Sequence, residues 1–140
     1  RWVKSNQGTM TSLISRDGVH RTKMTTRREG GRGAVSHYVV QRRIDSSLGK
    51  FSLLEVRIDT GRTHQIRVHL ASLGHPVVGD FLYGAPRVLR GKNQTVASLA
   101  RNFLHAAELQ FRHPRHGQEL LFKTALPAEL EEFILGVCRG

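Results

Sequence analysis

Alternating hydrophobic and polar positions in the first half of the chain predict a β-hairpin. Residues 34–45 are rich in β-branched and aromatic side chains, and residues 51–60 alternate between two faces, with Leu53 as an exception to the apolar–polar pattern. The glycine-bearing segment 46–50 lies between them and supplies the turn. In the second strand the even-numbered positions form the better core face: Ser52, Leu54, Val56 and Ile58.

After this hairpin the apolar residues recur at every third or fourth position instead of every second, which predicts a helix over residues 64–73. Ile66, Leu70 and Leu73 recur there at helical spacing. Thr60 or Thr63 can cap the start of the helix, and Gly74 follows its end.

A second hairpin and a terminal helix are expected near the end of the chain. Residues 108–112 and 119–124 are predicted to pair as strands across a turn that contains Pro114 and Gly117. Further on, apolar side chains share one helical face: Leu130, Phe133, Ile134 and Val137. The predicted fold class is α+β, mainly antiparallel β-sheet with flanking helices.

Residues 5–33 are polar, glycine-rich and basic, and predict a long ribbon or loop with little regular structure. A loop of this length is uncommon in a compact domain unless it has a role. Its charge makes contact with phosphate groups the expected role.

The overall charge supports a polyanionic partner. The chain has 22 Lys and Arg against 11 Asp and Glu, for a net charge of +11. Residues 1–43 alone carry ten basic side chains against Asp17 and Glu29. Nucleic acid is the usual partner of such a surface, although charge alone leaves open a soluble protein that is simply basic.

Cysteine content and hydropathy indicate the cellular compartment and whether the chain associates with a membrane. Cys138 is the only cysteine, so an intramolecular disulfide is impossible and a reducing, cytoplasmic compartment is expected. No apolar run approaches the roughly 20 residues that cross a bilayer, so no membrane association is expected. Because the chain begins on Arg1 rather than Met, we expect it to be a piece of a longer protein.

Residues 60–84 contain the candidate chemistry. A helix start that bears Arg62, His64 and Arg67 favours anions such as phosphate or carboxylate. His64 and Arg67 are three apart and share a face beside the apolar stripe, which places Arg67 at the core margin. A charge there needs an acidic partner, and from spacing alone a structural salt bridge is the favoured interpretation.

The same run resembles the central motif of the RluA-like family of pseudouridine synthases. The matching residues are Thr60-Gly61-Arg62-Thr63-His64-Gln65-Ile66-Arg67-Val68-His69, then Gly74-His75-Pro76 and Gly79-Asp80. Residues 14–24 resemble the family's upstream basic segment, and residues 104–114 resemble its later strand. The resemblance therefore covers most of the chain.

This resemblance implies an enzyme that isomerises uridine in structured RNA, with ribosomal RNA expected, and that needs no cofactor and no metal. Arg67 matches the family's active-site arginine, which pairs with a nucleophilic aspartate, and Leu104 matches an apolar wall against the uracil. The implied RNA-binding residues are Arg16, Arg21, Lys23, Arg27, Arg28, Arg32, Arg62 and His64.

The family's histidine-arginine-leucine-aspartate motif, which supplies the nucleophile, is absent from these residues. Asp80 is interpreted as loop architecture, so Arg67 is expected to lack its partner here. We therefore expect residues 1–140 to be the carboxyl-terminal portion of one catalytic domain: an RNA-facing ribbon (5–33), a hairpin, motif helix and loop (34–84), and a hairpin with a terminal helix (99–137). The alternative is a non-catalytic RNA-binding module that retains the fold. An exposed sheet edge where strands are missing would favour self-association.

Overall fold

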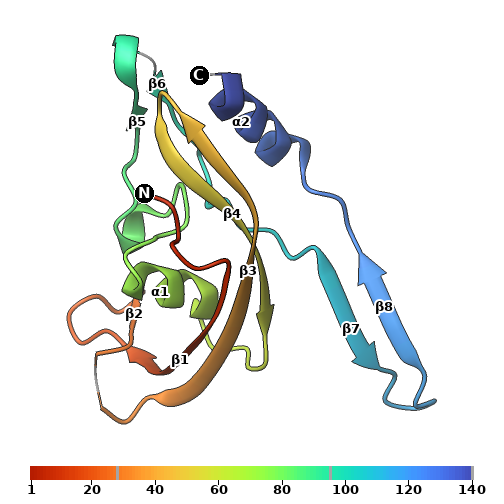
Figure 1. Ribbon diagram of the computed structural model, residues 1–140. Coiled ribbons are helices and arrows are strands. Elements are labelled where there is room, and N and C mark those ends of the chain that lie inside the picture. The colour runs from red at the N-terminus through yellow and green to blue at the C-terminus, as the bar shows by residue number, and fades with distance from the viewer. Residues whose placement is uncertain (28, 95, 140) are drawn as a thin grey trace.

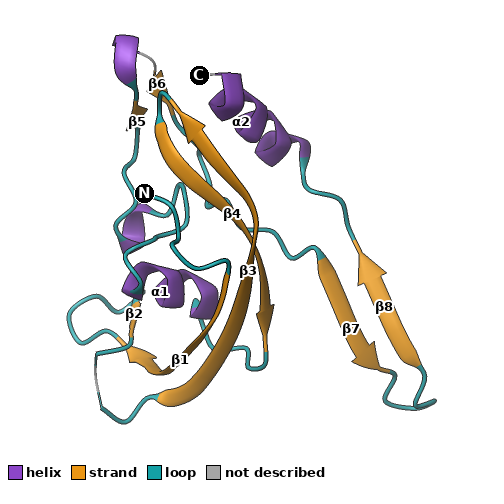
Figure 2. Ribbon diagram, viewed as in Figure 1, coloured by secondary structure: helices purple, strands orange, loops and turns teal. Residues whose placement is uncertain are grey.

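A twisted antiparallel sheet forms the centre of the molecule (Figures 1 and 2). The computed structural model describes residues 1–27, 29–94 and 96–139. The four strands of the central sheet follow the order β2-β1-β3-β4. Their bounds are Gln7–Arg16 for β1, Met24–Thr25 for β2, Arg32–Ser46 for β3 and Gly49–Ile58 for β4. With helices packed beside it, this sheet confirms the α+β prediction.

The strand β1 corrects the prediction that residues 5–33 have little regular structure. It pairs with β3 from Gln7 opposite Val39 to Ile14 opposite Arg32, so between β1 and β3 only the loops on either side of β2 are irregular. Met10 and Ile14 are buried, but Ser12 lies between them on the same face and interrupts the apolar alternation. That polar position concealed the strand in the sequence.

The predicted hairpin is confirmed as β3 and β4. The register of the two strands shifts at a bulge between Val40 and Arg42. Leu54 and Val56 pack against a core cluster, as expected for the even-numbered face, whereas Ile58 is 45% exposed at the end of its strand. The cluster itself consists of Val3, Met10, Tyr38, Leu70 and Val77.

The motif helix is α1, Gln65–Ser72, and it crosses the sheet beside β1 and β3 (Figure 1). Neither Thr60 nor Thr63 caps it. The capping position is His64, which adopts a left-handed conformation (φ 54°) and makes no side-chain capping bond. The predicted end is confirmed, because Leu73 is the carboxyl-terminal cap and Gly74 follows with φ 81°.

A buried polar network joins α1 to the sheet. His69 is 1% exposed, and its ring nitrogens lie 2.7 Å from Ser12 Oγ and 2.8 Å from Ser36 Oγ. Gln65 Nε2 also donates to Ser36 Oγ at 2.9 Å. Ser36 can therefore accept from Gln65 and donate to His69 Nδ1, while His69 Nε2–H donates to Ser12. This arrangement suits a neutral imidazole, and burial lowers the pKa of His69.

After α1 the chain forms a loop region with short elements. The first is the 3-10 helix η1, Phe81–Tyr83. Two short strands then pair as a two-stranded sheet: β5, Leu89–Arg90, and β6, Val96–Ala97. The 3-10 helix η2, Lys92–Gln94, lies between them in the sequence. Leu89 and Ala97 pack against a second core cluster made by Ile44, Leu48 and Val137.

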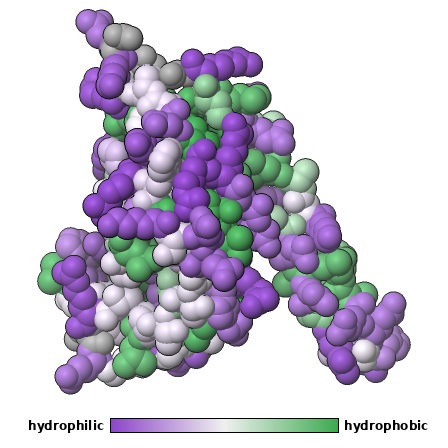
Figure 3. Space-filling model, viewed as in Figure 1, coloured by the Kyte–Doolittle hydropathy of each residue, from purple (hydrophilic) through white to green (hydrophobic). Residues whose placement is uncertain are grey.

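The predicted second hairpin is confirmed as β7, Glu108–Arg112, and β8, Glu119–Lys123. It extends away from the central sheet as a separate arm (Figure 1). One face of this arm is apolar, and Figure 3 shows hydrophobic surface along it above a hydrophilic tip. That face consists of Leu109, Phe111, Leu120 and Phe122.

The terminal helix is α2, Ala128–Arg139. Its predicted apolar face is confirmed: Leu130 and Val137 are buried, and Phe133 and Ile134 pack against the cluster of Ile44 and Leu48. No helix among the described residues is long and apolar enough to span a bilayer.

The buried imidazole of His69 predicts a loss of stability in mild acid. Its pKa in the folded chain is lowered from 6.5, so as the pH falls below 6.5 the unfolded state binds the proton first. The free energy of unfolding should then fall by at most about 1.4 kcal/mol per pH unit for this group. Urea unfolding at about pH 7.5 and about pH 5.5 measures the effect.

The variant His69→Gln removes the titrating ring, and it should show a smaller difference between the two pH values even if it is less stable at both. His64 and His75 also have lowered pKa values and keep part of the dependence in that variant. An unchanged difference would show that His69 does not contribute.

Candidate active site

Arg67 forms a two-bond ion pair with Asp80. Its Nε donates to Asp80 Oδ2 at 2.7 Å, and its Nη2 donates to Asp80 Oδ1 at 2.9 Å. The Asp80 side chain is 1% exposed and that of Arg67 is 17% exposed. The hydrogen bonds to Asp80 raise the pKa of Arg67 above its ordinary value. The guanidinium is therefore a permanently charged group held at the edge of the core.

The backbone around Asp80 holds its carboxylate in place. Asp80 N–H donates to the Val77 carbonyl at 3.0 Å, and the Asp80 carbonyl accepts from Tyr83 and Ala85, both at 3.1 Å. Gly79 precedes it with φ 82°, and a Cβ at that position would collide with the carbonyl oxygen of Arg101. Glycine is thus required for the 77–85 loop to approach the Arg101 segment.

Tyr83 covers the guanidinium of Arg67. The centre of its ring lies 5.0 Å from Arg67 Cζ, and Lys23 Nζ lies 5.6 Å from the same centre. The Tyr83 hydroxyl accepts from Met24 N–H at 2.9 Å and lies 2.7 Å from His64 Nδ1. Burial raises the pKa of Tyr83, so the phenol keeps the proton that it donates to His64.

His64 combines an unusual backbone with a fixed side chain. A left-handed conformation is uncommon for residues other than glycine, and such positions concentrate at functional sites. Burial, and then the positive charge of Arg67, lower the pKa of His64. Because Tyr83 donates to Nδ1, the neutral ring carries its proton on Nε2. His64 and Arg67 were expected to share a helical face; instead His64 precedes the helix as its cap, and both residues contact Tyr83.

Gln65 organises the turn that leads into α1. Its Oε1 accepts from Thr60 Oγ1 at 2.8 Å and from Arg62 N–H at 3.0 Å. Its Nε2 donates to the Val35 carbonyl at 2.9 Å as well as to Ser36. Thr60 Oγ1 also accepts from Val35 N–H at 3.0 Å. These bonds give the polar groups of the turn partners within the protein, and they fix the direction in which α1 begins.

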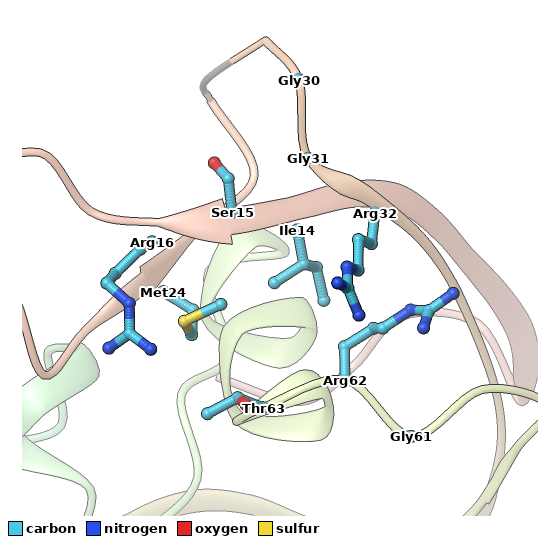
Figure 4. A pocket seen from close by; sticks show the side chains of 10 residues that line it. All are labelled: Ile14, Ser15, Arg16, Met24, Gly30, Gly31, Arg32, Gly61, Arg62 and Thr63. Atoms are coloured by element: carbon cyan, nitrogen blue, oxygen red, sulfur yellow. The ribbon is translucent and has the colours of Figure 1, made fainter.

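A basic cavity of about 420 Å³ lies next to this turn. Three predicted RNA-binding residues line it from separate segments: Arg16 at the end of β1, Arg32 at the start of β3 and Arg62 before α1 (Figure 4). Gly31 forms part of the wall, and a Cβ there would lie 2.8 Å from the Ile14 backbone. The fold thus brings together arginines that are up to 46 residues apart in the sequence, from Arg16 to Arg62.

The other predicted RNA-binding residues lie around this cavity or beyond it. The Arg21 carbonyl accepts from Arg16 Nη1 at 2.9 Å, which ties the β1–β2 loop to the cavity. Lys23 reaches the Tyr83 ring instead. The Arg27 side chain is exposed, and its backbone N–H donates to Thr25 Oγ1 at 3.2 Å. Arg28 lies outside the described residues.

Leu104 is partly buried against the cluster that contains Leu70 and Val77. The neighbouring Phe103 N–H donates to the Val78 carbonyl at 2.7 Å, which holds this segment alongside the loop that carries Asp80. Leu104 therefore belongs to the same side of the molecule as the ion pair. Its role as a wall of the uracil pocket stays a prediction.

Two residues of the site were missed in the sequence. Asp80 was assigned to loop architecture, and Arg67 was expected to lack a partner; instead Asp80 pairs with Arg67 through two hydrogen bonds. The need of Arg67 for an acidic partner was the signal that could have identified Asp80. Tyr83 had no such signal, because its ring and hydroxyl meet residues from two distant segments, Met24 on β2 and the pair His64 and Arg67 at α1.

The site holds a fixed cation, and the carboxylate beside it in the part of the chain that the structure describes is already engaged. Both Asp80 oxygens accept bonds from Arg67, and the carboxylate is shielded from solvent. Asp17 Oδ1 accepts from the backbone N–H groups of Val19 and His20, and Asp59 pairs with His37 at 2.7 Å. Within the described ranges, no three His, Cys, Asp or Glu side chains gather as around a metal ion.

Comparison with known proteins gives one consistent family. Residues 2–72 match the family model described as RNA pseudouridylate synthase. The chain is 45% identical over 124 residues to an "Uncharacterized RNA pseudouridine synthase" of Chloroflexus aurantiacus, covering 89% of this chain and 35% of the relative. It is 38% identical over 130 residues to "Ribosomal large subunit pseudouridine synthase D" of Nitrosomonas europaea, covering 93% and 36%.

A solved structure agrees with these matches. The fold is similar to that of "Human RNA Pseudouridylate Synthase Domain Containing 1", with a TM-score of 0.68 and 25% sequence identity. The likeness covers 97% of this chain and 61% of the human chain. The chain thus spans a little over a third of the length of the two bacterial relatives.

Proposed function

Because the chain belongs to the RNA pseudouridylate synthase family, we propose that it forms the arginine-bearing part of an enzyme that isomerises uridine to pseudouridine in RNA. The observation that carries the proposal is the position of Arg67. It lies within the residues matched by the family model and is held at the core margin by a buried carboxylate. The nucleophilic aspartate would come from a further segment of the same protein.

The chemistry suits a fixed guanidinium. The reaction breaks the N1–C1′ glycosidic bond of uridine, turns the uracil while it stays bound, and joins it again through C5. A nearby arginine favours the ionised form of an attacking aspartate and orients it. Since the target base must leave its helical stack, the enzyme also needs a basic surface that grips the surrounding strand.

The cavity lined by Arg16, Arg32 and Arg62 is the proposed grip on the RNA backbone. Arginine side chains recognise phosphate through paired N–H donors, and glycines at the wall let a backbone approach closely. Gly30, Gly31 and Gly61 all line this cavity. We assign the exposed Arg21, before β2, and the exposed Arg27, after it, to the same basic surface.

The names of several relatives support ribosomal RNA as the substrate. We therefore propose ribosomal RNA as the substrate and the cytoplasm as the location of the enzyme. Transcriptome-wide mapping of pseudouridine in cells with and without the gene would identify the target; loss of sites only outside ribosomal RNA would contradict this part.

A non-catalytic RNA-binding module with the same fold is the rival function. It is favoured by one observation, the lack of an available carboxylate beside Arg67 among the residues that the structure describes. The two functions differ in what they require of Arg67. An RNA-binding module needs a positive charge, whereas the enzyme needs the planar fork of an arginine.

The variant Arg67→Lys should separate these functions. Lysine keeps the charge beside Asp80, so the fold should persist, but it cannot reproduce the guanidinium geometry. In the full-length protein we expect pseudouridine formation to fall by about a hundredfold while RNA affinity changes by less than about twofold. Pseudouridine detection on a cellular RNA substrate, with filter binding on the same RNA, measures both. Wild-type protein with RNA affinity and no isomerisation would favour the binding module.

The double variant Arg32→Ala and Arg62→Ala should weaken RNA binding and reduce its salt dependence. Removal of each arginine that neutralises a phosphate should lower the slope of log K against log salt by about 0.7 to 0.9. Titration of single-stranded and duplex RNA at several salt concentrations gives the slope. A matched control is Arg112→Ala with Arg115→Ala, which removes two charges from the distant β7–β8 arm. Equal effects of both double variants would mean that only total charge matters.

Self-association is proposed for the 140-residue chain taken alone. An isolated two-stranded hairpin is marginal in water, and the apolar face of β7 and β8 is a surface that a second copy can cover. Sedimentation at rising protein concentration should show a species larger than the monomer. Phe111→Ser with Phe122→Ser should abolish it, whereas Leu121→Ser, on the opposite face, should not. A monomer at all concentrations would contradict the proposal.

A further inference from the structure

Asp80 engages only one edge of the Arg67 guanidinium. The bonds run from Nε and Nη2, which lie on the same side of the group, and they use two of its five N–H donors. Nη1 has no hydrogen-bond partner in the part of the chain that the structure describes. The second edge, formed by Nη1 and the outer N–H of Nη2, is therefore open to another acceptor.

The rest of the site prevents the guanidinium from turning. Tyr83 lies over it, and the Tyr83 hydroxyl is anchored to Met24 and His64. Asp80 is fixed by its backbone bonds to Val77, Tyr83 and Ala85. Neither the carboxylate nor the ring can follow a rotation of Arg67, so the open edge keeps one direction.

We propose that Asp80 is a positioning residue, which locks Arg67 through one edge so that the other edge receives the carboxylate of the nucleophilic aspartate in a second two-bond pair. This inference rests on the proposed function. Carboxylate and guanidinium match in shape, and a single arginine can bind one carboxylate along each edge. Asp80 acts through Arg67 and touches neither the substrate nor the reacting atoms.

Asp80 has a second effect that follows from charge. Arg67 alone would strongly favour the ionised state of an approaching carboxylate. With Asp80 already bound, the pair is nearly neutral, and the second carboxylate meets orienting donors rather than a full unit of positive charge. The arrangement therefore favours orientation of the nucleophile over a large reduction of its basicity.

A purely structural ion pair is the competing explanation. It would require only that Asp80 neutralise a half-buried charge, and it predicts that substitutions act through folding alone. Positioning instead predicts a selective loss of turnover in protein that remains folded.

The first test uses acetate as a probe on the 140-residue chain. In ¹⁵N-labelled protein, acetate should shift the Arg67 Nη resonances and leave Nε unchanged, because Asp80 already holds Nε. Arg67→Lys identifies these signals by their absence. A shift at Nε, or none at Nη, would overturn the proposal. This measurement needs neither activity nor a variant of Asp80.

The second test uses Asp80→Asn in the full-length protein, which keeps the shape of the side chain and removes its charge. We expect kcat to fall by about a hundredfold and KM for RNA to change by less than about twofold, in protein that still melts cooperatively. Asp45→Asn is the matched control, since Asp45 pairs with Lys50 at 3.7 Å on the surface.

The results of these tests distinguish failure of the positioning role of Asp80 from failure of the synthase function. An active wild type whose kcat is unchanged by Asp80→Asn would overturn the positioning role and leave the synthase function standing. A wild type that binds RNA without isomerising uridine would instead remove the function, while the acetate titration would still decide which edge of Arg67 is open.

Discussion

The ion pair between Arg67 and Asp80 is the constraint on which the surrounding structure depends. Removing two charges from water costs several kcal/mol each, so the pair is tolerated only with favourable geometry, and loss of either partner would cost about 3–5 kcal/mol. Good geometry requires that α1 present Arg67 at one rotation and that the 77–85 loop return to meet it. The left-handed Gly79, the bond that Asp80 N–H donates to Val77 and the bond that Asp80 accepts from Ala85 satisfy the second requirement.

The rotation of α1 is fixed from its opposite side by uncharged polar groups. His69 and Gln65 both reach Ser36 on β3, and His69 also reaches Ser12 on β1. Hydrophobic contacts alone tolerate small rotations of a helix, whereas directed hydrogen bonds in a dry interior do not. The helix is thus anchored by polar groups on the sheet side and by the ion pair on the loop side.

The periodic elements of the fold could be predicted from the sequence, because their core faces repeat. The hairpin of β3 and β4, the helices α1 and α2, and the pairing of β7 with β8 all follow from this pattern. The strand β1 was missed because Ser12 faces a buried histidine that lies 57 residues away. The His64 cap was missed because a left-handed backbone is uncommon at a residue other than glycine, and the side-chain contact of His64 is with Tyr83, 19 residues away.

The candidate site also has a part that the sequence predicted and a part that it did not. The motif around Arg67 identified the cation, and the charge of the early segment identified the basic surface. The carboxylate of Asp80 was not assigned to Arg67, because a loop has no period from which its direction could be inferred. Contacts made by loops are set by long-range closure, and only the requirement that a half-buried charge be neutralised pointed toward them.

The hydrogen-bonding groups that hold α1 and Asp80 in place lie between Ser12 and Ala85, and the segment that follows Arg101 packs against the loop that carries Asp80. The orientation of the guanidinium is therefore established when this part of the chain folds, before any nucleophile approaches. A preorganised donor loses little conformational entropy when its acceptor arrives, and this is the condition under which electrostatic orientation is most effective. Tyr83 extends the same rigidity to Met24, so the β2 segment beside the basic cavity and the arginine are fixed by one side chain.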